Sequence, residues 1–343
     1  MTRRERALAA LRCRVPDRIP IFELLVDSAL LKAATPQGDY VAFAKEFDFD
    51  LVLTGTPSDL YDKRWIDESK GLYENEWGMK RQYTEQTVSV PLEGPIKEPS
   101  DLDTYEPPDP LAPRRFESLQ RLLDEFGGER AVGMHLHDSF NYCYYLRGME
   151  EMMMDIILNP ELVRGLVRLS VEHNIAMARR AIELGADFIV LGDDYGSSTG
   201  PLVSPQHFAE FFIPGLGEVV AAIHDAGGIA IKHCCGDINA LLDMMVLEAG
   251  IDALHPLDKT VNMDMVEVKQ KFPGRLCVMG GVDCGAALCD DPPERLEDIV
   301  RELRATVGER GGFVIASSNS LHKGVRLENY RAMVDAVKRV GTY

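Results

Sequence analysis

The chain has 343 residues, of which 45% are hydrophobic and 27% charged, and its formal net charge is −18 at pH 7. This length and hydrophobic content are sufficient for one large α/β domain with a buried core. The acidic balance excludes non-specific binding to nucleic acid, because phosphate backbones are held by basic surfaces. The chain lacks an apolar run of the roughly 20 residues that a membrane span needs, so we expect no membrane association.

The N-terminal segment is charged over residues 1–6 and then briefly apolar over residues 7–11. The apolar stretch is too short for the core of a signal peptide, and it predicts an amphipathic first helix. Without an export signal, the seven cysteines are expected to be reduced thiols rather than a disulfide framework. We therefore expect a cytoplasmic protein.

Short apolar runs alternate with helical stretches along the chain. The runs that predict strands are 19–26, 50–55, 131–137, 187–194, 229–235, 253–258, 276–283 and 312–319. Most are continuous rather than alternating, as expected of parallel strands covered on both sides. The clearest predicted helices are 160–184, 204–226, 293–310 and 327–340. Strand–helix alternation repeated eight times predicts an α/β fold, a (β/α)8 TIM barrel forming a single domain over residues 1–343, with a doubly wound sheet as the alternative.

Residues 56–113 are longer than a plain strand–helix unit needs, and they contain both tryptophans, Trp65 and Trp77. The alternating run 82–92 predicts a β-hairpin, and the stretch 95–113, rich in proline and aspartate, predicts a surface connection. We expect residues 56–113 to be an insertion that caps the mouth of the barrel. A surface hairpin without a role in function fits the same pattern.

Functional groups of such barrels lie where the strands end, at the C-terminal face. The polar residues at these ends are His135, His137, Asp193, Asp194, Tyr195, His233, Cys235, His255, Asp258, Asp283, Asn319 and His322. We expect catalytic roles for Asp193, Asp194 and Tyr195. Substrate binding is the expected role of His135, His137, Asn319 and His322. Packing at the rim and capping of turns are the alternatives for the histidines and the aspartates respectively.

Residues 229–236 read Ile-Ala-Ile-Lys-His-Cys-Cys-Gly. Side chains two positions apart on a strand share a face, so His233 and Cys235 point toward one place. An imidazole and a thiolate are ligands that suit zinc. Cys234 faces the other way and is expected to be a buried thiol.

These segments resemble the uroporphyrinogen decarboxylase superfamily. The resemblance is carried by Gly-Asp-Asp-Tyr-Gly at 192–196, Ser-Pro at 204–205, His-Cys-Cys-Gly at 233–236, Met-Gly-Gly-Val-Asp at 279–283 and the segment 327–333. It implies a (β/α)8 barrel and one of two activities. The decarboxylases themselves use no metal and carry paired arginines in an Arg-x-x-Gly-Arg pattern. The corresponding residues 18–24, Arg-Ile-Pro-Ile-Phe-Glu-Leu, lack that pattern.

The second activity implied by the resemblance is that of the cobamide-dependent methyltransferases, whose zinc motif is His-x-Cys with a second cysteine far downstream. His233 and Cys235 match the first half, whereas Asn319 stands where the second cysteine is expected. Asp258 is then the expected third ligand, with Asp194, His255 and His322 as other candidates by position.

On this resemblance we expect a zinc-dependent methyltransferase. It would move a methyl group between a small-molecule donor or acceptor and a methylcobamide carried by a partner corrinoid protein, and a homodimer is compatible with it. The alternatives are a metal-free decarboxylase or lyase and a non-catalytic tetrapyrrole-binding barrel.

Overall fold

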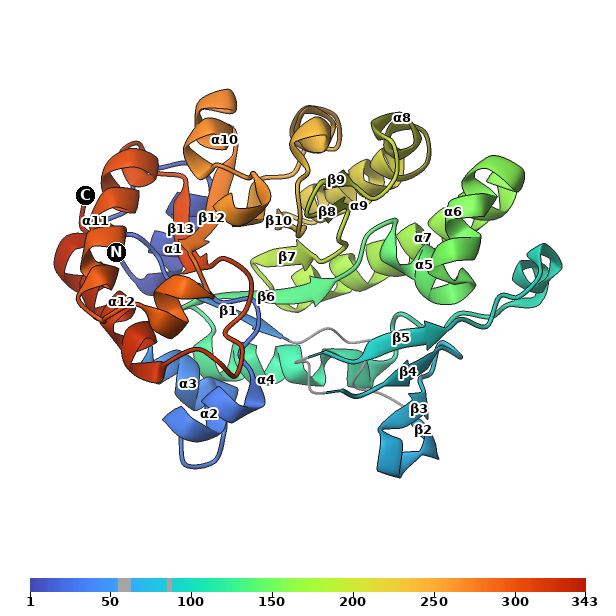
Figure 1. Ribbon diagram of the computed structural model, residues 1–343, viewed down its shortest axis with the longest axis horizontal. Coiled ribbons are helices and arrows are strands. Elements are labelled where there is room, and N and C mark those ends of the chain that lie inside the picture. The colour runs from blue at the N-terminus through green and yellow to red at the C-terminus, as the bar shows by residue number, and fades with distance from the viewer. Residues whose placement is uncertain (55–62, 85–87) are drawn as a thin grey trace.

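The computed structural model describes residues 1–54, 63–84 and 88–343 (Figure 1). Within these residues the main sheet has seven parallel strands, whose order in space follows their order in the chain. They are β1 (Leu51–Thr54), β6 (Ala131–Leu136), β7 (Phe188–Leu191), β10 (Ile229–His233), β11 (Ala253–Leu257), β12 (Cys277–Val282) and β13 (Phe313–Ser317). Because the order never reverses, the sheet has no switch point and the doubly wound alternative is wrong. Each of these strands lies in a predicted run, although position 55 falls outside the described residues.

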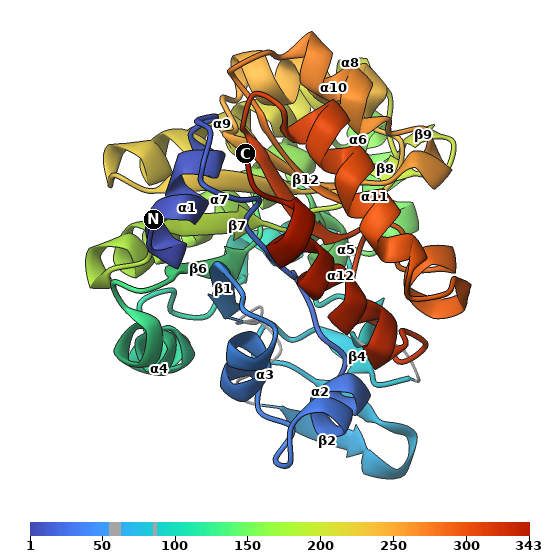
Figure 2. The ribbon, with the colours of Figure 1, turned by 90° about the vertical axis from the view of Figure 1, so that its left-hand side faces the viewer.

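Helices cover the outside of the curled main sheet (Figures 1 and 2). In chain order they are α1 (Arg3–Leu11), α2 (Ser28–Ala34), α3 (Tyr40–Glu46), α4 (Glu117–Phe126), α5 (Asn141–Arg147), α6 (Met149–Leu158), α7 (Pro160–Leu184), α8 (Pro205–His207), α9 (Ile213–Asp225), α10 (Met265–Lys271), α11 (Arg295–Leu303) and α12 (Leu327–Val340). The long α7 begins at a proline and ends at Gly185, whose φ of 118° suits only glycine. None of the described helices is long and apolar enough to cross a bilayer.

The prediction of a first strand over residues 19–26 is wrong, because this segment forms no continuous strand. It forms isolated bridges, Ile21 with Ile315 and Val26 with Leu321, instead of a continuous ladder. Pro20 has no N–H to donate, and the N–H of Ile21 goes to the Asp50 carboxylate at 2.8 Å. The Ile21 carbonyl nevertheless accepts from the N–H of Asp50, while the Phe22 N–H donates to Ile315. Residues 20–22 are therefore hydrogen-bonded to both edges of the main sheet, which explains why the sheet curls.

Successive residues of the main strands pack into two separate cores. Ile229 and Ile231 of β10 belong to an inner core, together with Phe188, Met279 and Val314 of other strands. Ala230, between them, belongs to the larger core that lies between the sheet and the helices. The period of two then places His233 inside the curled sheet and Lys232 on its helix side.

A second, antiparallel sheet lies within residues 63–93. Its strands among the described residues are β2 (Arg64–Asp67), β3 (Leu72–Glu74), β4 (Lys80–Gln82) and β5 (Val90–Glu93). Strands β4 and β5 pair across the predicted hairpin at 82–92, whose residues 85–87 lie outside the described part, as do residues 56–62 of the predicted insertion. The described sheet is thus larger than the single hairpin predicted. A third pairing joins the two-residue strands β8 (Gly196–Ser197) and β9 (Gly200–Pro201).

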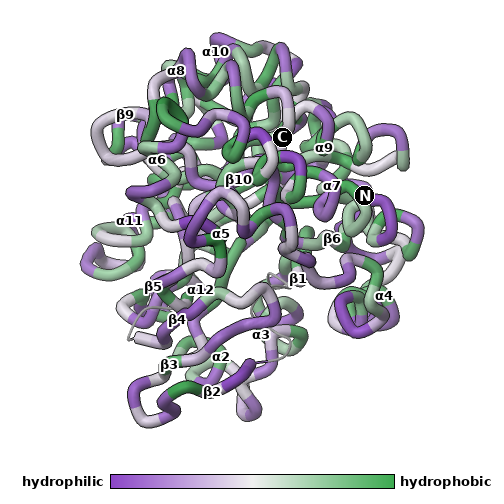
Figure 3. Tube along the Cα trace, turned by 90° about the vertical axis from the view of Figure 1, so that its right-hand side faces the viewer, coloured by the Kyte–Doolittle hydropathy of each residue, from purple (hydrophilic) through white to green (hydrophobic). Residues whose placement is uncertain are grey.

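The antiparallel sheet lies beside α5, the helix that follows β6 (Figure 3). Ile96, just after β5, donates its N–H to the carbonyl of Leu146 at 3.0 Å. Gly94 allows this approach, since a Cβ there would lie 2.0 Å from the same carbonyl oxygen. The Trp77 ring stacks on Tyr142 of α5 with centroids 4.2 Å apart. These contacts hold the antiparallel sheet at the end of the main sheet where the parallel strands finish.

Candidate metal centre

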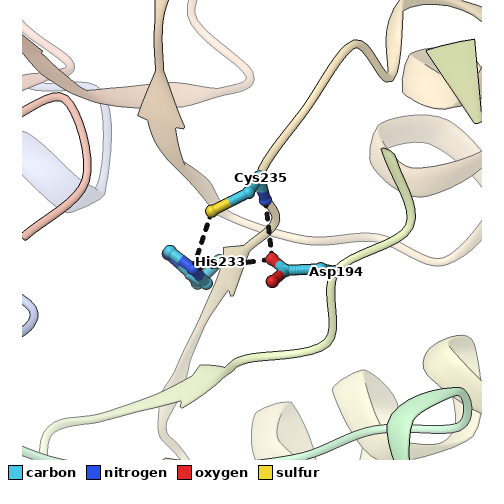
Figure 4. Close-up of side chains that lie close together, drawn as sticks. All are labelled: Asp194, His233 and Cys235. Atoms are coloured by element: carbon cyan, nitrogen blue, oxygen red, sulfur yellow. Dashed lines mark hydrogen bonds and ion pairs between the residues drawn. The ribbon is translucent and has the colours of Figure 1, made fainter. Parts of the chain in front are cut away.

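Three side chains of different chemistry meet where β7 and β10 end (Figure 4). One ligand atom from each of Asp194, His233 and Cys235 lies within 4.8 Å of the other two. Nε2 of His233 is 3.4 Å from Sγ of Cys235 and 3.6 Å from Oδ1 of Asp194. Within the described part of the chain, these histidine, cysteine and aspartate side chains are close enough together to hold a metal ion, and we call them the metal group.

The local backbone explains why the three side chains converge. His233 ends β10, and Cys235 follows two residues later on the same face. Gly236, with φ 88°, then turns the chain so close to Gly196 that a Cβ would lie 2.4 Å from a backbone atom. The N–H of Cys235 donates to the Asp194 carboxylate at 2.8 Å, which joins the two strand ends.

Burial sets the protonation of the two ligands predicted from sequence. It lowers the pKa of His233 to about 3, with a smaller contribution from the charge of Lys232, so the imidazole is neutral at physiological pH. Burial and the charge of Asp194 raise the pKa of the Cys235 thiol well above its usual value. A neutral imidazole is ready to bind a cation, whereas the thiol has to release its proton when a cation binds.

Two neighbouring side chains hold the ligands from outside the metal group. Nδ1 of His233 lies 2.9 Å from Nδ1 of His255, which is fully buried on β11. Such a hydrogen bond to the second ring nitrogen fixes the orientation of a metal-binding histidine. Asn319 donates its side-chain N–H to Sγ of Cys235 at 3.3 Å. Asn319 therefore lies beside the metal group and holds the Cys235 sulfur in place.

Two residues predicted for the site lie outside the metal group. Oδ1 of Asp258, the predicted third ligand, accepts from the N–H and the hydroxyl of Thr260 at 2.8 and 2.7 Å. It caps the turn after β11 and does not belong to the metal group, and Asp194 stands there instead. His322, predicted to bind substrate, contacts the Cys284 carbonyl through Nε2 and accepts the Gly324 N–H through Nδ1. Nδ1 is thus occupied by its own loop, and Nε2 by the loop that follows β12.

Tyr195, predicted to be catalytic, lies on the helix side of the sheet and is fully buried. Its hydroxyl donates to the carboxylate of Asp138. Lys232 donates to the other oxygen of Asp138 at 2.7 Å, and its Nζ lies 4.2 Å from the Tyr195 ring centroid. The tyrosine is thus part of a buried ion-pair network rather than of the metal group, because alternate residues after β7 face opposite sides.

Asp193, His137 and His135, the remaining predicted site residues, line the ends of β6 and β7. Nδ1 of His137 is 2.7 Å from Oδ1 of Asp193, and both residues are buried. Burial raises the pKa of Asp193, but the hydrogen bond from His137 and the charges of His137 and Lys232 outweigh it, so the pKa is lowered. The ring of His135 lies over Gly192, where a Cβ would be 1.9 Å from Nε2.

Sequence reasoning missed Lys232 and Asp138 and the support given by His255. A signal for Lys232 was present: a lone lysine between Ile231 and His233 in an apolar run is costly to bury unless an acid pairs with it. Its partner could not be found that way, because Asp138 is 94 residues away in the sequence.

Comparisons with known proteins show which family the chain is similar to. The uroporphyrinogen decarboxylase (URO-D) family matches residues 74–340. A protein named methylcobamide:CoM methyltransferase MtaA, from Methanosarcina barkeri, is 25% identical over 225 residues, covering 65% of this chain and 62% of that protein. A uroporphyrinogen decarboxylase from Psychromonas ingrahamii is 24% identical over 181 residues, covering 52% of this chain and 48% of that protein. The chain therefore spans between about half and three-fifths of these curated relatives.

A solved structure described as a methyltransferase from Methanosarcina mazei has a similar fold over its whole length. Its TM-score is 0.76 at 18% sequence identity, and the similarity covers 99% of both chains. At this identity the similarity shows the fold alone. The family match, however, includes the strand ends that carry the metal group, and it confirms the resemblance read from the sequence. The chain belongs to the uroporphyrinogen decarboxylase family.

Proposed function

We propose that this protein is a zinc-dependent methyltransferase that moves a methyl group between a small substrate and the cobamide of a separate corrinoid protein. The observation that carries the proposal is the metal group, in which nitrogen, sulfur and oxygen atoms lie within 4.8 Å of one another at the C-terminal ends of β7 and β10. The names of the Methanosarcina relatives support the methyl-transfer part.

The residues of the metal group fit zinc. Cysteine, histidine and aspartate are its usual ligands, and three protein ligands leave a position for substrate, as in catalytic zinc sites. His233 offers Nε2, because its Nδ1 faces His255. When bound, zinc would supply Lewis acidity toward a sulfur or oxygen atom of the substrate. Asp194, His233 and Cys235 would hold the ion, and Asn319 and His255 would keep the sulfur and the imidazole in place.

The decarboxylase alternative is less well supported. Arg18 is the arginine in the segment where such enzymes carry arginines for substrate propionates. It binds Asp48 and Asp50, each at 3.1 Å, and is only 12% exposed at its side chain. Asp50 precedes β1, so Arg18 lies at the end of the main sheet away from the metal group.

We further propose that residues 20–22 take the position of the eighth strand in a (β/α)8 barrel. Their hydrogen bonds to both edge strands support this, as does the fold shared with the Methanosarcina mazei protein. The antiparallel sheet, within the predicted insertion 56–113, would cover the barrel mouth, because it contacts α5 at that end.

Metal analysis and a methyl-transfer assay test the proposed function together. Purified protein should contain about one zinc per chain, and His233→Asn should remove most of it. With zinc bound, the wild type should transfer methyl groups to or from free cobalamin; the two reactions are methylcob(III)alamin with 2-mercaptoethanol, and cob(I)alamin with methyl donors. Transfer in neither direction, or full activity in the presence of a chelator that removes the zinc, would contradict the proposal.

A further inference from the structure

His137, which is outside the metal group, lies at the same end of the main sheet as that group. Leu136, Leu191 and Lys232 lie side by side in the register of β6, β7 and β10. The next row therefore holds His137, Gly192 and His233. His137 and His233 are two strand spacings apart, roughly 10 Å between their backbones. Residues in one row of a sheet share a face, so the register places His137 on the face of the sheet that carries His233.

The His137 ring has a fixed orientation. Nδ1 faces Oδ1 of Asp193 at 2.7 Å, and the other carboxylate oxygen accepts the N–H groups of Phe140 and Asn141 at 2.8 and 2.9 Å. The ring also packs edge-on against Tyr142, with centroids 4.9 Å apart. Asp193 is fully buried, and its carboxylate is anchored by hydrogen bonds on both oxygens.

The second nitrogen of the ring is available. Among the described residues no hydrogen bond is made by Nε2 of His137, and the side chain is 8% exposed. A carboxylate on Nδ1 fixes the tautomer and stabilises the imidazolium form, which then offers a proton at Nε2. The pair thus has the construction of a proton donor or acceptor.

The chemistry of methyl transfer decides which substrate needs such a donor. A thiol that accepts a methyl group has to lose a proton, and metal binding already promotes that loss. A methylated ammonium group departs as a neutral amine and needs no proton. A methyl group bonded to oxygen leaves behind an alkoxide or phenoxide, which is strongly basic and is stabilised by a proton donated as it departs.

We propose that His137, oriented by Asp193, donates a proton to the departing oxygen of an oxygen-bound methyl donor, so that the substrate class is an alcohol such as methanol or a methyl ether. This inference rests on the proposed function. The methyl carbon forms its new bond with cob(I)amide of the partner corrinoid protein, whose electron pair makes the bond, so the cobalt is oxidised from Co(I) to Co(III). The electron pair of the broken C–O bond stays on oxygen, which takes the Nε2 proton and leaves as the alcohol. His137 regains its proton from water. His137 is the catalytic residue and Asp193 positions it.

The leaving group provides the kinetic test. Cob(I)alamin, under anaerobic reducing conditions, is the methyl acceptor, and the donors are methanol, methoxybenzene and 4-nitroanisole. For His137→Gln we expect a rate loss of at least about 100-fold with methanol and methoxybenzene. With 4-nitroanisole the loss should be under about tenfold, because nitrophenoxide departs without a proton. His207→Gln removes an imidazole from α8 that belongs neither to the metal group nor to the His137–Asp193 pair; it is the matched control and should be unaffected.

The other outcomes separate this inference from the proposed function. Equal losses with all three donors, a selective loss of thiol methylation from methylcob(III)alamin, or a wild type that methylates the thiol but uses no oxygen-bound donor would overturn the inference alone. A wild type that transfers no methyl group to or from cobalamin would overturn the proposed function as well.

A spectroscopic readout is independent of zinc and of activity. In the ¹⁵N NMR spectrum of metal-free protein, we expect Nδ1 of His137 to carry a proton hydrogen-bonded to Asp193. The signal should shift in Asp193→Asn while the melting transition shows that the variant is folded. An unprotonated Nδ1 in the folded wild type would overturn the inference.

Discussion

The two faces of strand β10 carry different polar groups: a buried ion pair on the helix side and the metal group on the inner side. On the helix side, Lys232 is fully buried and donates to Asp138 at 2.7 Å and to the Asp193 carbonyl at 2.5 Å. On the inner side, His233 and Cys235 bring lone-pair donors together with Asp194. One face pairs a cation with an anion, and the other gathers atoms that bind cations.

The difference separates polar groups that are paired within the fold from the polar groups on which the proposed function depends. The Lys232–Asp138 pair is complete within the protein, and a buried pair of this kind is retained because losing one partner leaves an uncompensated charge. The metal group instead combines an imidazole whose pKa is lowered by burial with a thiol whose pKa is raised by burial. Both ligands are neutral without a cation, so the inner face can remain folded and still bind one.

Removing Lys232 should have the largest effect on stability. Lys232→Met leaves the Asp138 carboxylate buried without its cation, which should cost about 3–5 kcal/mol of unfolding free energy. Denaturant unfolding of metal-free protein measures this cost. The double variant Lys232→Met with Asp138→Asn should recover part of it, since no charge then remains unpaired. If Lys232→Met lost less than about 1 kcal/mol of unfolding free energy, the Lys232–Asp138 pair would contribute no more than an exposed ion pair does. The contrast drawn between the two faces of β10 would then be wrong.

Glu23, a second buried acid, forms no ion pair within residues 1–54, 63–84 and 88–343, and it should make stability depend on pH. Glu23 accepts the Ser317 N–H at 3.0 Å, and burial raises its pKa to about 8. The unfolded value is about 4.3, so between these two pH values the folded protein holds a proton that the unfolded chain has lost. The stability that this neutral carboxyl contributes is fully present below about pH 4.3 and is lost as the pH rises through about 8.

Glu23→Gln should therefore flatten the pH profile of stability. Relative to this variant, the wild type should lose about 2–4 kcal/mol of unfolding free energy between about pH 5 and about pH 8. Unfolding curves at several pH values provide the measurement. Parallel profiles for the two proteins would show that Glu23 is ionised when folded.

Substitution of the adjacent Cys234 and Cys235 tests whether only the inner face of β10 affects zinc binding. Cys235→Ala removes a ligand of the metal group, and zinc affinity should fall by more than the roughly 10–100-fold that a lost supporting residue costs. Cys234→Ala is the matched control, because that sulfur is buried on the other side and accepts the Tyr195 N–H at 3.1 Å. Competition with a zinc chelator measures both affinities. Equal losses would mean that strand alternation does not separate the ligands.

Substitution of His255 should lower zinc affinity less than substitution of Cys235 does, and it is the smallest effect that we predict. His255→Leu removes the partner of His233 Nδ1, so we expect zinc affinity to fall by about 10–100-fold while the protein stays folded. His255→Asn keeps a hydrogen-bonding group and should recover part of the affinity. The absorption spectrum of the cobalt(II)-substituted protein should shift in His255→Leu, because the orientation of the His233 ring changes. An unaltered spectrum and affinity would leave His255 with a packing role only.

The sequence by itself determined most of the secondary structure and two members of the metal group. Continuous apolar runs located the strands, because burial on both faces requires them, and the proline at 160 and the glycine at 185 delimited α7. The period of two along β10 directed His233 and Cys235 to one place. The run at 19–26 was overpredicted because hydrophobicity alone does not reveal that Asp50 takes the hydrogen bond of Ile21.

Only the tertiary structure decided the third member of the metal group and the pairings around it. Asp194 and Asp258 are both acids at strand ends, and their spacing in the sequence does not distinguish them. The Cys235 N–H holds Asp194 beside the sulfur, whereas Asp258 is occupied by its own turn. The pairs His137–Asp193 and Lys232–Asp138 likewise join residues 56 and 94 positions apart. Local sequence fixes which face a side chain takes, but which partner it meets depends on how the strands are brought together.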